Sequence, residues 1–147
     1  MAEHAGCLLC EMEDAAADQV VFRDDLWAAE VVPGYEVPGW FILRARRHAE
    51  RLTGLDDAEL ASFGQRARDL VAAVTDVTGA PATYLLAFGE NYLHFHALVA
   101  ARGAEVPPEL RAGNILRLRE DHTDLAAAVR LVPDMRLAYR SAAGSMT

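Results

Sequence analysis

The chain has 147 residues, of which 52% are hydrophobic and 24% are charged. This length and balance predict one globular domain with a sizeable core, and they exclude a disordered chain. The formal charge of −8 argues against nucleic acid as the main partner, because binding to its backbone depends on clustered Lys and Arg.

The sequence also predicts where the protein resides. Its first residues, Met-Ala-Glu-His-Ala-Gly, lack the basic and apolar segments of a signal peptide. No apolar run approaches the ~18 residues that a membrane-spanning helix needs. We therefore expect no membrane association and a cytoplasmic location. In that reducing compartment, cysteines at CxxC spacing are metal ligands or redox partners more often than a structural disulfide.

Three short strands are predicted in the first third of the chain. Residues 20–24 and 26–32 are β-prone runs joined by a tight turn at Asp24-Asp25. A third strand, 40–44, follows a loop bracketed by two Pro-Gly pairs. It leads into a basic run that ends at His48. The arginines Arg44, Arg46 and Arg47 of this run, together with Arg102, could form a local pocket for a small anion.

The clearest helix is predicted over residues 56–77. Apolar residues recur there at three- and four-residue steps and form one continuous core stripe. They are Leu60, Phe63, Ala67, Leu70, Val71, Val74 and Val77. Asp56 and Asp57 suit the positive end of the helix dipole, and Gly79 and Pro81 stop the helix.

Two further β-prone runs, 82–88 and 94–101, are expected to pair as a hairpin. In the second run, His94, His96, Leu98 and Ala100 line one face of the strand, because alternate side chains point to the same side.

Helical segments are expected over 109–119 and 124–132 after a linker at 103–108, with Pro133 ending the second helix and the last few residues frayed. Strands grouped around one long helix predict an α+β fold with an antiparallel β-sheet and one long packed helix. We expect residues 1–102 to form a domain with a metal site, and residues 103–147 to form a mainly helical segment packed on it.

Four potential zinc ligands stand out. Cys7 and Cys10 have a spacing that presents both sulfurs to one ion. Alone, this spacing is as typical of two half-buried residues near the chain start as it is of a zinc site. His48 alone is typical of a solvated residue, and His94 alone of a core histidine bonded to a carbonyl. As a set they complete a closed Cys2His2 shell, which is structural rather than catalytic. His96 is then free for nucleophilic attack on phosphorus.

The chain resembles the histidine triad (HIT) superfamily of nucleotide hydrolases and transferases. The resemblance covers about two-thirds of the chain, from Cys7 to Arg102. It is carried by the Cys-x-x-Cys pair, by Pro38-Gly-Trp-Phe-Ile-Leu-Arg-Ala-Arg-Arg-His48, by the entry into the long helix, and by His94-Phe-His96-Ala-Leu98-Val-Ala-Ala-Arg102. It implies structural zinc on Cys7, Cys10, His48 and His94, with His96 as the nucleophile that forms a nucleotidyl-histidine. It further implies a nucleotide or similar phosphate ester as ligand, and a homodimer.

The chain departs from the family pattern at two places. Leu98 stands where the family has its third histidine, and related hexose-phosphate uridylyltransferases have a glutamine there. Leucine can neither donate nor accept a proton, which removes a general-acid contribution worth roughly 10²- to 10⁴-fold. The loop before the signature strand offers only Asn91 as a phosphate-gripping asparagine. Asn91, position 98 and Arg102 are thus the substrate-binding positions that the resemblance implies.

Alternative interpretations follow from these departures. A shifted alignment places Tyr92, His94 and His96 on the three motif positions, but it loses the fourth zinc ligand. The leading function is a zinc-stabilised hydrolase of nucleotide phosphoesters or phosphoramidates, or a nucleotidyl transferase, that acts through His96. The others are a catalytically impaired nucleotide-binding or regulatory protein, and a purely structural zinc protein.

Overall fold

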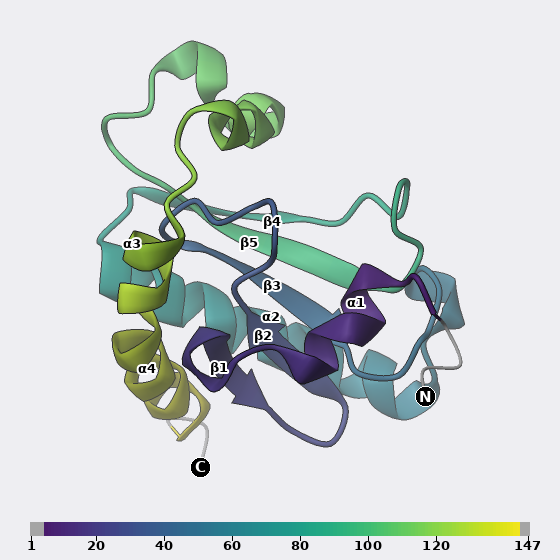
Figure 1. The fold of residues 1–147 in the computed structure, drawn as a ribbon. Helices are drawn as coiled ribbons and strands as arrows, with labels where there is room; N and C mark the ends of the chain where they lie inside the picture. The colour runs from purple at the N-terminus through teal and green to yellow at the C-terminus, as the bar shows by residue number, and fades with distance from the viewer. Residues whose placement is uncertain (1–4, 145–147) are drawn as a thin grey trace.

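A computed structural model describes residues 5–144. Its centre is a five-stranded antiparallel sheet with the strand order β1-β2-β3-β5-β4, and the predicted α+β class is confirmed (Figure 1). Within the described range, no helix is both long and apolar enough to cross a bilayer. The strands are β1 Val20–Arg23, β2 Trp27–Glu30, β3 Trp40–Ala45, β4 Ala82–Leu86 and β5 His96–Arg102.

The strands form where alternating side chains can be buried and where turn residues close the connections. The Asp24 carboxylate accepts hydrogen bonds from the backbone N–H groups of Leu26 and Trp27 at 2.9 and 2.8 Å, which closes the predicted β1–β2 turn. At the centre of the sheet, Arg44 of β3 lies directly opposite His96 of β5. The sheet register therefore fixes which groups surround His96.

Helix α2 spans Asp57–Thr78, close to the predicted range. Asp56 is its N-cap and forms a capping box with Glu59, which satisfies two backbone donors at the helix start. Gly79 ends the helix with a left-handed φ of 65°, a conformation that glycine adopts without strain. Most of the predicted stripe packs against the sheet, but Leu60 is half exposed, because the helix start extends beyond the core.

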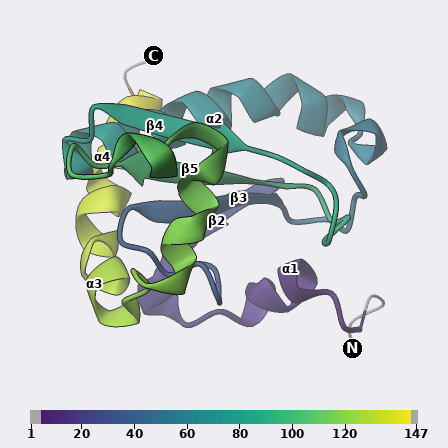
Figure 2. The same cartoon turned by 90° about the horizontal axis from the view of Figure 1, so that it is seen from above.

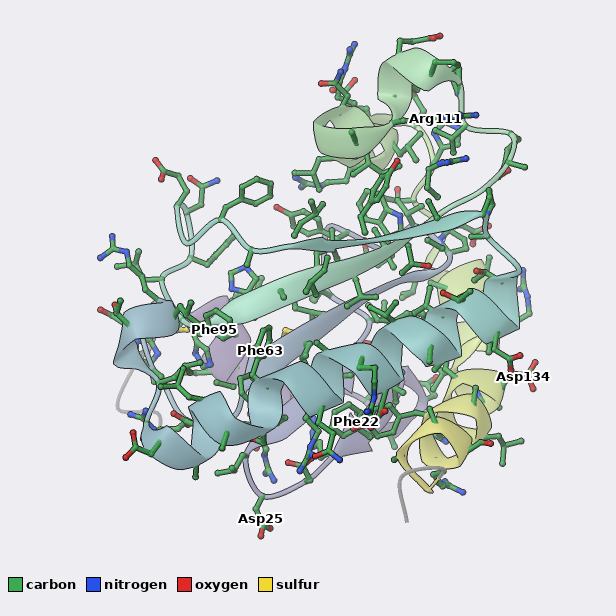
Figure 3. The ribbon with its side chains drawn as sticks, turned by 180° about the vertical axis from the view of Figure 1, so that it is seen from behind. Phe22, Asp25, Phe63, Phe95, Arg111 and Asp134 are labelled. Carbon is green, nitrogen blue, oxygen red and sulfur yellow. The ribbon has the colours of Figure 1, made fainter. Side chains whose placement is uncertain are left out.

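Helices α2, α3 (Leu125–Arg130) and α4 (Val132–Gly144) pack into one core with the sheet. In Figure 2, α2 runs along one side of the sheet and α1 lies on the opposite side. Phe63 of α2 and Phe95, just before β5, meet edge to face with ring centroids 5.3 Å apart between helix and sheet (Figure 3). Fully buried Trp27 joins the same cluster, and its indole N–H donates to Ser62 of α2 at 2.9 Å. This cluster is the larger of two cores.

Short segments from both ends of the chain cover the other side of the sheet. They bury Leu9, Trp40, Ile42, Leu98 and Ile115 in a second core. The short helices are α1 Leu8–Glu11, η1 Met12–Asp14, η2 Ala17–Gln19, η3 Leu52–Gly54, η4 Pro108–Leu110 and η5 Ala112–Glu120. Leu98 and Ala100 face this second core whereas Phe95 and Val99 face the first, as the predicted alternation requires.

The C-terminal third differs from prediction in two respects. The expected helix 109–119 is two 3-10 segments separated at Arg111, with Ala112 at a left-handed φ of 54°. Pro133 does not end the helical region. It lies in the first turn of α4, where its missing N–H has no partner to lose. The last residues, 145–147, for which fraying was expected, lie outside the described range.

Candidate functional site

The structure brings the four predicted zinc ligands together from three separate segments. Cys7 caps α1, with its sulfur accepting a hydrogen bond from the Cys10 backbone N–H at 3.4 Å, so both sulfurs lie on the same side of the turn. His48 follows β3. His94 precedes β5 in an isolated bridge with Glu50. The ligand atoms of all four residues lie within 4.8 Å of one another.

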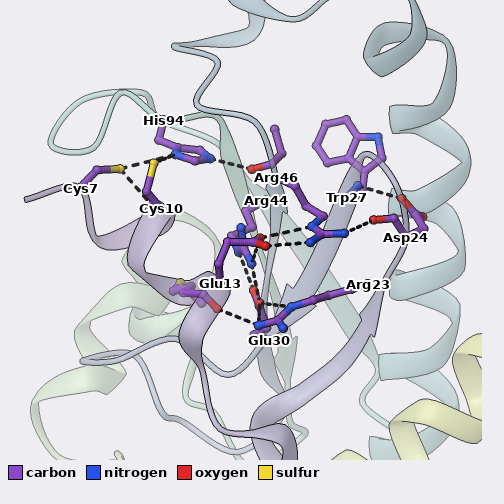
Figure 4. Close-up of polar contacts among 12 residues, drawn as sticks. Cys7, Cys10, Glu13, Arg23, Asp24, Trp27, Glu30, Arg44, Arg46 and His94 are labelled. Atoms are coloured by element: carbon purple, nitrogen blue, oxygen red, sulfur yellow. Dashed lines mark hydrogen bonds and ion pairs between the residues drawn. The ribbon is translucent and has the colours of Figure 1, made fainter. Parts of the chain in front are cut away.

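The spacing within this quartet fits a zinc ion. His94 Nδ1 lies 3.4 Å from each of the two sulfurs (Figure 4). His48 Nδ1 lies 3.2 Å from Cys10 Sγ. In a tetrahedral site with Zn–S near 2.3 Å and Zn–N near 2.0 Å, sulfur and nitrogen ligands are about 3.5 Å apart. The donor set and its spacing are therefore those of a closed structural site.

Both histidines of the quartet are oriented by an acceptor that faces the outer ring nitrogen, Nε2. His94 Nε2 donates to the Ala45 carbonyl oxygen at 2.6 Å, and His48 Nε2 lies 3.1 Å from the Glu50 carboxylate. Such bonds to the outer ring nitrogen fix the tautomer and leave the inner nitrogen free to ligate. Sequence reasoning missed Glu50, although its position two residues after His48 in an extended segment puts it on the same side.

Burial shifts the pKa of two residues of the quartet, His94 and Cys10. It lowers the pKa of His94 to about 4 and, as the largest of several causes, raises the pKa of Cys10 to about 11. The metal-free site therefore holds a neutral imidazole and a protonated thiol at neutral pH. An ion that binds there must displace the thiol proton.

His96 lies beside the quartet, and its ring orientation is fixed. Its Nδ1 donates to the His94 carbonyl oxygen at 2.7 Å. In a neutral imidazole this bond leaves Nε2 with the lone pair. The carbonyl belongs to a residue that is itself part of the quartet, so the metal site and the His96 ring are linked through one backbone segment.

Three hollows share His96 in their lining. One, of about 440 Å³, lies on the α2 side and includes Arg51, Phe63 and Leu93. A second, of about 430 Å³, is lined by aromatic rings and by the loop between β4 and β5; its residues are Tyr35, Phe88, Gly89, Glu90, Asn91, Tyr92 and Leu116. A third, of about 70 Å³, is apolar and includes Leu98. A side chain that can act as a nucleophile therefore adjoins space for a ligand.

The predicted substrate-binding positions are only partly brought together. Asn91 is exposed and lines the aromatic hollow with His96. Leu98 is 6% exposed and lies opposite Ile42 and Leu86, so the third motif position is filled and apolar. Arg102 ends β5 opposite Ala82. It is six residues beyond His96, about 20 Å along the strand.

The basic pocket expected from four arginines does not form, because carboxylates of the chain itself pair with three of them and the fourth, Arg102, lies at the far end of β5. Arg44 pairs with Glu30 and Glu13, and Arg46 pairs with Glu13. Arg47 instead pairs with a glutamate of α2 at 2.7 Å. These ion pairs connect the end of β3 to η1, β2 and the start of α2. The sequence carried no signal for this, because the partners are distant along the chain.

No family model matches the chain, and no curated protein sequence matches it. Solved structures of similar fold exist. A hypothetical histidine triad nucleotide-binding protein from Sulfolobus tokodaii has a TM-score of 0.71 at 17% identity, covering 92% of this chain and 93% of that chain. A zinc-bound histidine triad family protein from Mycobacterium smegmatis has a TM-score of 0.67 at 16% identity, covering 95% and 97%.

A uridylyltransferase is similar as well, with a TM-score of 0.66 at 20% identity over 94% of this chain and 46% of that chain. These likenesses identify the fold as the histidine triad fold, as the sequence motifs predicted. The Cys2His2 quartet favours the register in which His94 is the first motif histidine over the one that begins at Tyr92, because His94 is one of its four members.

Proposed function

We propose that this protein is a zinc-stabilised histidine-triad-like protein that binds a nucleotide or similar phosphate ester and cleaves or transfers it through His96. The observation that carries the proposal is the His96 ring, fixed by the 2.7 Å bond from Nδ1 to the His94 carbonyl, beside cavities that can hold a ligand. Two proteins of similar fold, a hypothetical histidine triad nucleotide-binding protein and a uridylyltransferase, are consistent with this activity.

The proposed reaction has two displacements at phosphorus. His96 Nε2 attacks the phosphorus atom, and the P–O or P–N bond to the leaving group breaks with its electron pair. The leaving group takes a proton from water, because Leu98 has none to give. Water or a second acceptor then attacks the nucleotidyl-histidine, and the P–N bond to His96 breaks. Nδ1 keeps its hydrogen bond to the His94 carbonyl throughout and supports the positive charge on the ring.

The charges around His96 favour a substrate with a single phosphate. Among the described residues, Arg51 and Glu90 are the only Arg, Asp or Glu side chains that line the three hollows. A chain of several phosphates would be desolvated there with little compensation. Aromatic rings from Tyr35, Phe88 and Tyr92 offer stacking surfaces for a planar group. A nucleoside phosphoramidate or aryl phosphodiester suits this site better than a dinucleoside polyphosphate.

In this proposal the metal has a structural role. Cys7, Cys10, His48 and His94 would hold zinc and leave no open coordination position. Bound there, zinc would supply cross-linking of the N-terminal segment to the sheet. His94 in turn presents the carbonyl that orients His96.

We further propose that the protein is a homodimer in which the sheets of two copies join. β4 is an edge strand, and its Leu85 is 46% exposed. The opposite edge, β1, packs against α4. An exposed edge strand with an apolar side chain needs covering. Light scattering at tens of micromolar tests this, and a monomer mass would contradict it.

The catalytic proposal is tested by intact-protein mass spectrometry and by leaving-group release. Wild type, His96→Ala and His122→Ala would each be incubated with nucleoside phosphoramidates, aryl phosphodiesters and dinucleoside polyphosphates. His122 is an exposed histidine that lines a hollow at the other end of the domain, so it is the matched control. Wild type and His122→Ala should turn over phosphoramidates, and His96→Ala should not. Turnover of His96→Ala at the wild-type rate would overturn the proposed nucleophile.

A second function, nucleotide binding without catalysis, is favoured by one specific observation. The third motif position, Leu98, is buried among apolar side chains and offers no proton donor. In that case calorimetry would show that wild type binds nucleotide, but the protein would turn over no substrate, whatever its leaving group. Binding without turnover would select this second function over the first.

A further inference from the structure

The segment that supplies the two cysteines is too short to hold itself in place. Helix α1 has four residues and η1 has three, far fewer than an isolated helix needs in water. Leu9 and Met12 anchor it in the second core. Half of the proposed zinc ligands therefore depend on how this segment docks on the sheet.

A second, ionic anchor lies directly after the cysteines. Glu13 reaches from η1 to Arg44 at 2.7 Å and to Arg46 at 2.8 Å (Figure 4). Arg44 is fully buried and also forms two bonds of 2.7 Å with the fully buried Glu30. The hydrogen bonds from Arg46, the largest cause, hold the pKa of Glu13 down at about 2, so its carboxylate is charged at neutral pH.

The ionic anchor and the quartet both connect the Cys7–Glu13 segment to the end of β3. Arg44 and Arg46 lie at the end of β3, and Ala45 between them accepts the hydrogen bond from His94. Glu13 is three residues after Cys10, one short turn along the chain. Docking of Glu13 on these arginines thus fixes where the two sulfurs lie relative to the two imidazoles.

We propose that Glu13 is a positioning residue of the metal centre, which holds the Cys7–Cys10 turn in its ligating position by bridging Arg44 and Arg46. The proposal rests on the zinc centre of the proposed function and adds a residue outside the quartet to it. Two contacts that stabilise the same docked segment are thermodynamically coupled. Loss of the ionic anchor therefore weakens zinc binding, and zinc in turn compensates for the lost anchor.

Glu13 can be replaced without leaving the buried guanidinium of Arg44 unpaired. If its carboxylate is neutralised, Arg44 still donates two hydrogen bonds to Glu30. A Glu13→Gln variant should therefore fold, which separates the positioning role from a requirement for the fold. An ordinary ion pair between exposed side chains would contribute too little to be measured. The full burial of Arg44 makes this bridge different.

The test compares Glu13→Gln with Glu11→Gln in the full-length protein. Glu11 is an exposed glutamate of the same segment, so its variant is matched in charge and position. Zinc dissociation constants would be measured by competition with a chromophoric chelator. We expect Glu13→Gln to bind zinc ~10- to 100-fold more weakly, the usual effect of losing an outer-shell group. Glu11→Gln should stay within about twofold of wild type, because exposed charges contribute little.

Hydrogen exchange of the metal-free proteins supplies a readout that a general loss of stability would not reproduce. Amides of residues 8–14 should exchange faster in Glu13→Gln, whereas those of β3 and β5 should be unchanged. Arg46→Gln removes the other end of the bridge and should give the same pattern.

Each contrary outcome has a distinct meaning. If wild type binds no zinc, the metal part of the proposed function fails. If wild type binds zinc and Glu13→Gln binds it as tightly as Glu11→Gln, the positioning role alone is overturned.

Discussion

Leu98→His is the substitution that most directly probes the chemistry of this site. Leu98 is 6% exposed, lies two residues from His96 on the same face, and shares with it the apolar hollow of about 70 Å³. A histidine there would put a proton donor about 6.5 Å along the strand from the nucleophile. It would also bury an imidazole among apolar side chains, which should lower the free energy of unfolding by about 1–3 kcal/mol.

The expected gain depends on the leaving group. General-acid catalysis is worth roughly 10²- to 10⁴-fold, and we expect the lower end, because burial lowers the pKa of an imidazole and reduces its protonated fraction. The gain should appear for alkyl esters, whose leaving groups are poor. It should be absent for aryl phosphodiesters, whose leaving groups depart without a proton.

The assay is kcat/KM for Leu98→His, wild type and Leu98→Met over a series of substrates that differ in leaving-group pKa. Leu98→Met keeps the volume and the apolar character without adding a proton donor, so it controls for repacking. A flatter dependence on leaving-group pKa in Leu98→His alone is the expected result. An equal gain for all substrates, or the same gain in Leu98→Met, would refute the general-acid explanation.

Four further outcomes are expected. Protein purified without added metal should contain one zinc per chain by elemental analysis, and chelation should lower the melting temperature; equal melting temperatures would refute the stabilising role. Glu30→Gln should reduce the free energy of unfolding in urea by about 3–5 kcal/mol, because it removes a buried carboxylate from fully buried Arg44. The exposed Asp25→Asn serves as its control. Asp56→Ala should cost about 0.5–2 kcal/mol through the lost N-cap of α2, measured the same way. Because the pKa of Glu13 is lowered to about 2 from 4.5, its stabilising contribution should be complete above pH 4.5 and lost as the pH falls toward 2. Acid titration of wild type against Glu13→Gln measures this, and parallel curves would contradict it.

The elements that the sequence predicted well are those with a local signal. The α2 helix has both a periodic stripe and a capping residue, and its predicted range differs from Asp57–Thr78 by one residue at each end. The metal quartet was predictable for a different reason. Ligand chemistry restricts cysteine and histidine to few roles, so a complete set of four indicates proximity without any knowledge of the chain path.

The elements that the sequence missed depend on contacts between distant residues. The bridge from Glu13 to Arg44 joins η1 to β3, and nothing in the local pattern distinguishes Arg44 from a solvated arginine. The C-terminal segment was mistaken because a proline signals both the end and the first turn of a helix. Only its packing decides, and Val132 and Met135 of α4 are buried in the first core.

Leu98, which stands at the third motif position, is surrounded by other apolar side chains. Leu98 shares its hollow with Leu8 of α1, Ile42 of β3, Leu86 of β4 and Leu116 of η5. The N-terminal helix α1 and the segment η5 thus both contribute apolar side chains around the third motif position, where the resemblance expects a polar group. A single polar substitution would enter a mainly apolar hollow, in which only Tyr35, Tyr92 and His96 among the lining side chains can form hydrogen bonds. The apolar surroundings and Leu98 are therefore one coherent feature, and full restoration of a general acid requires changes to its neighbours as well.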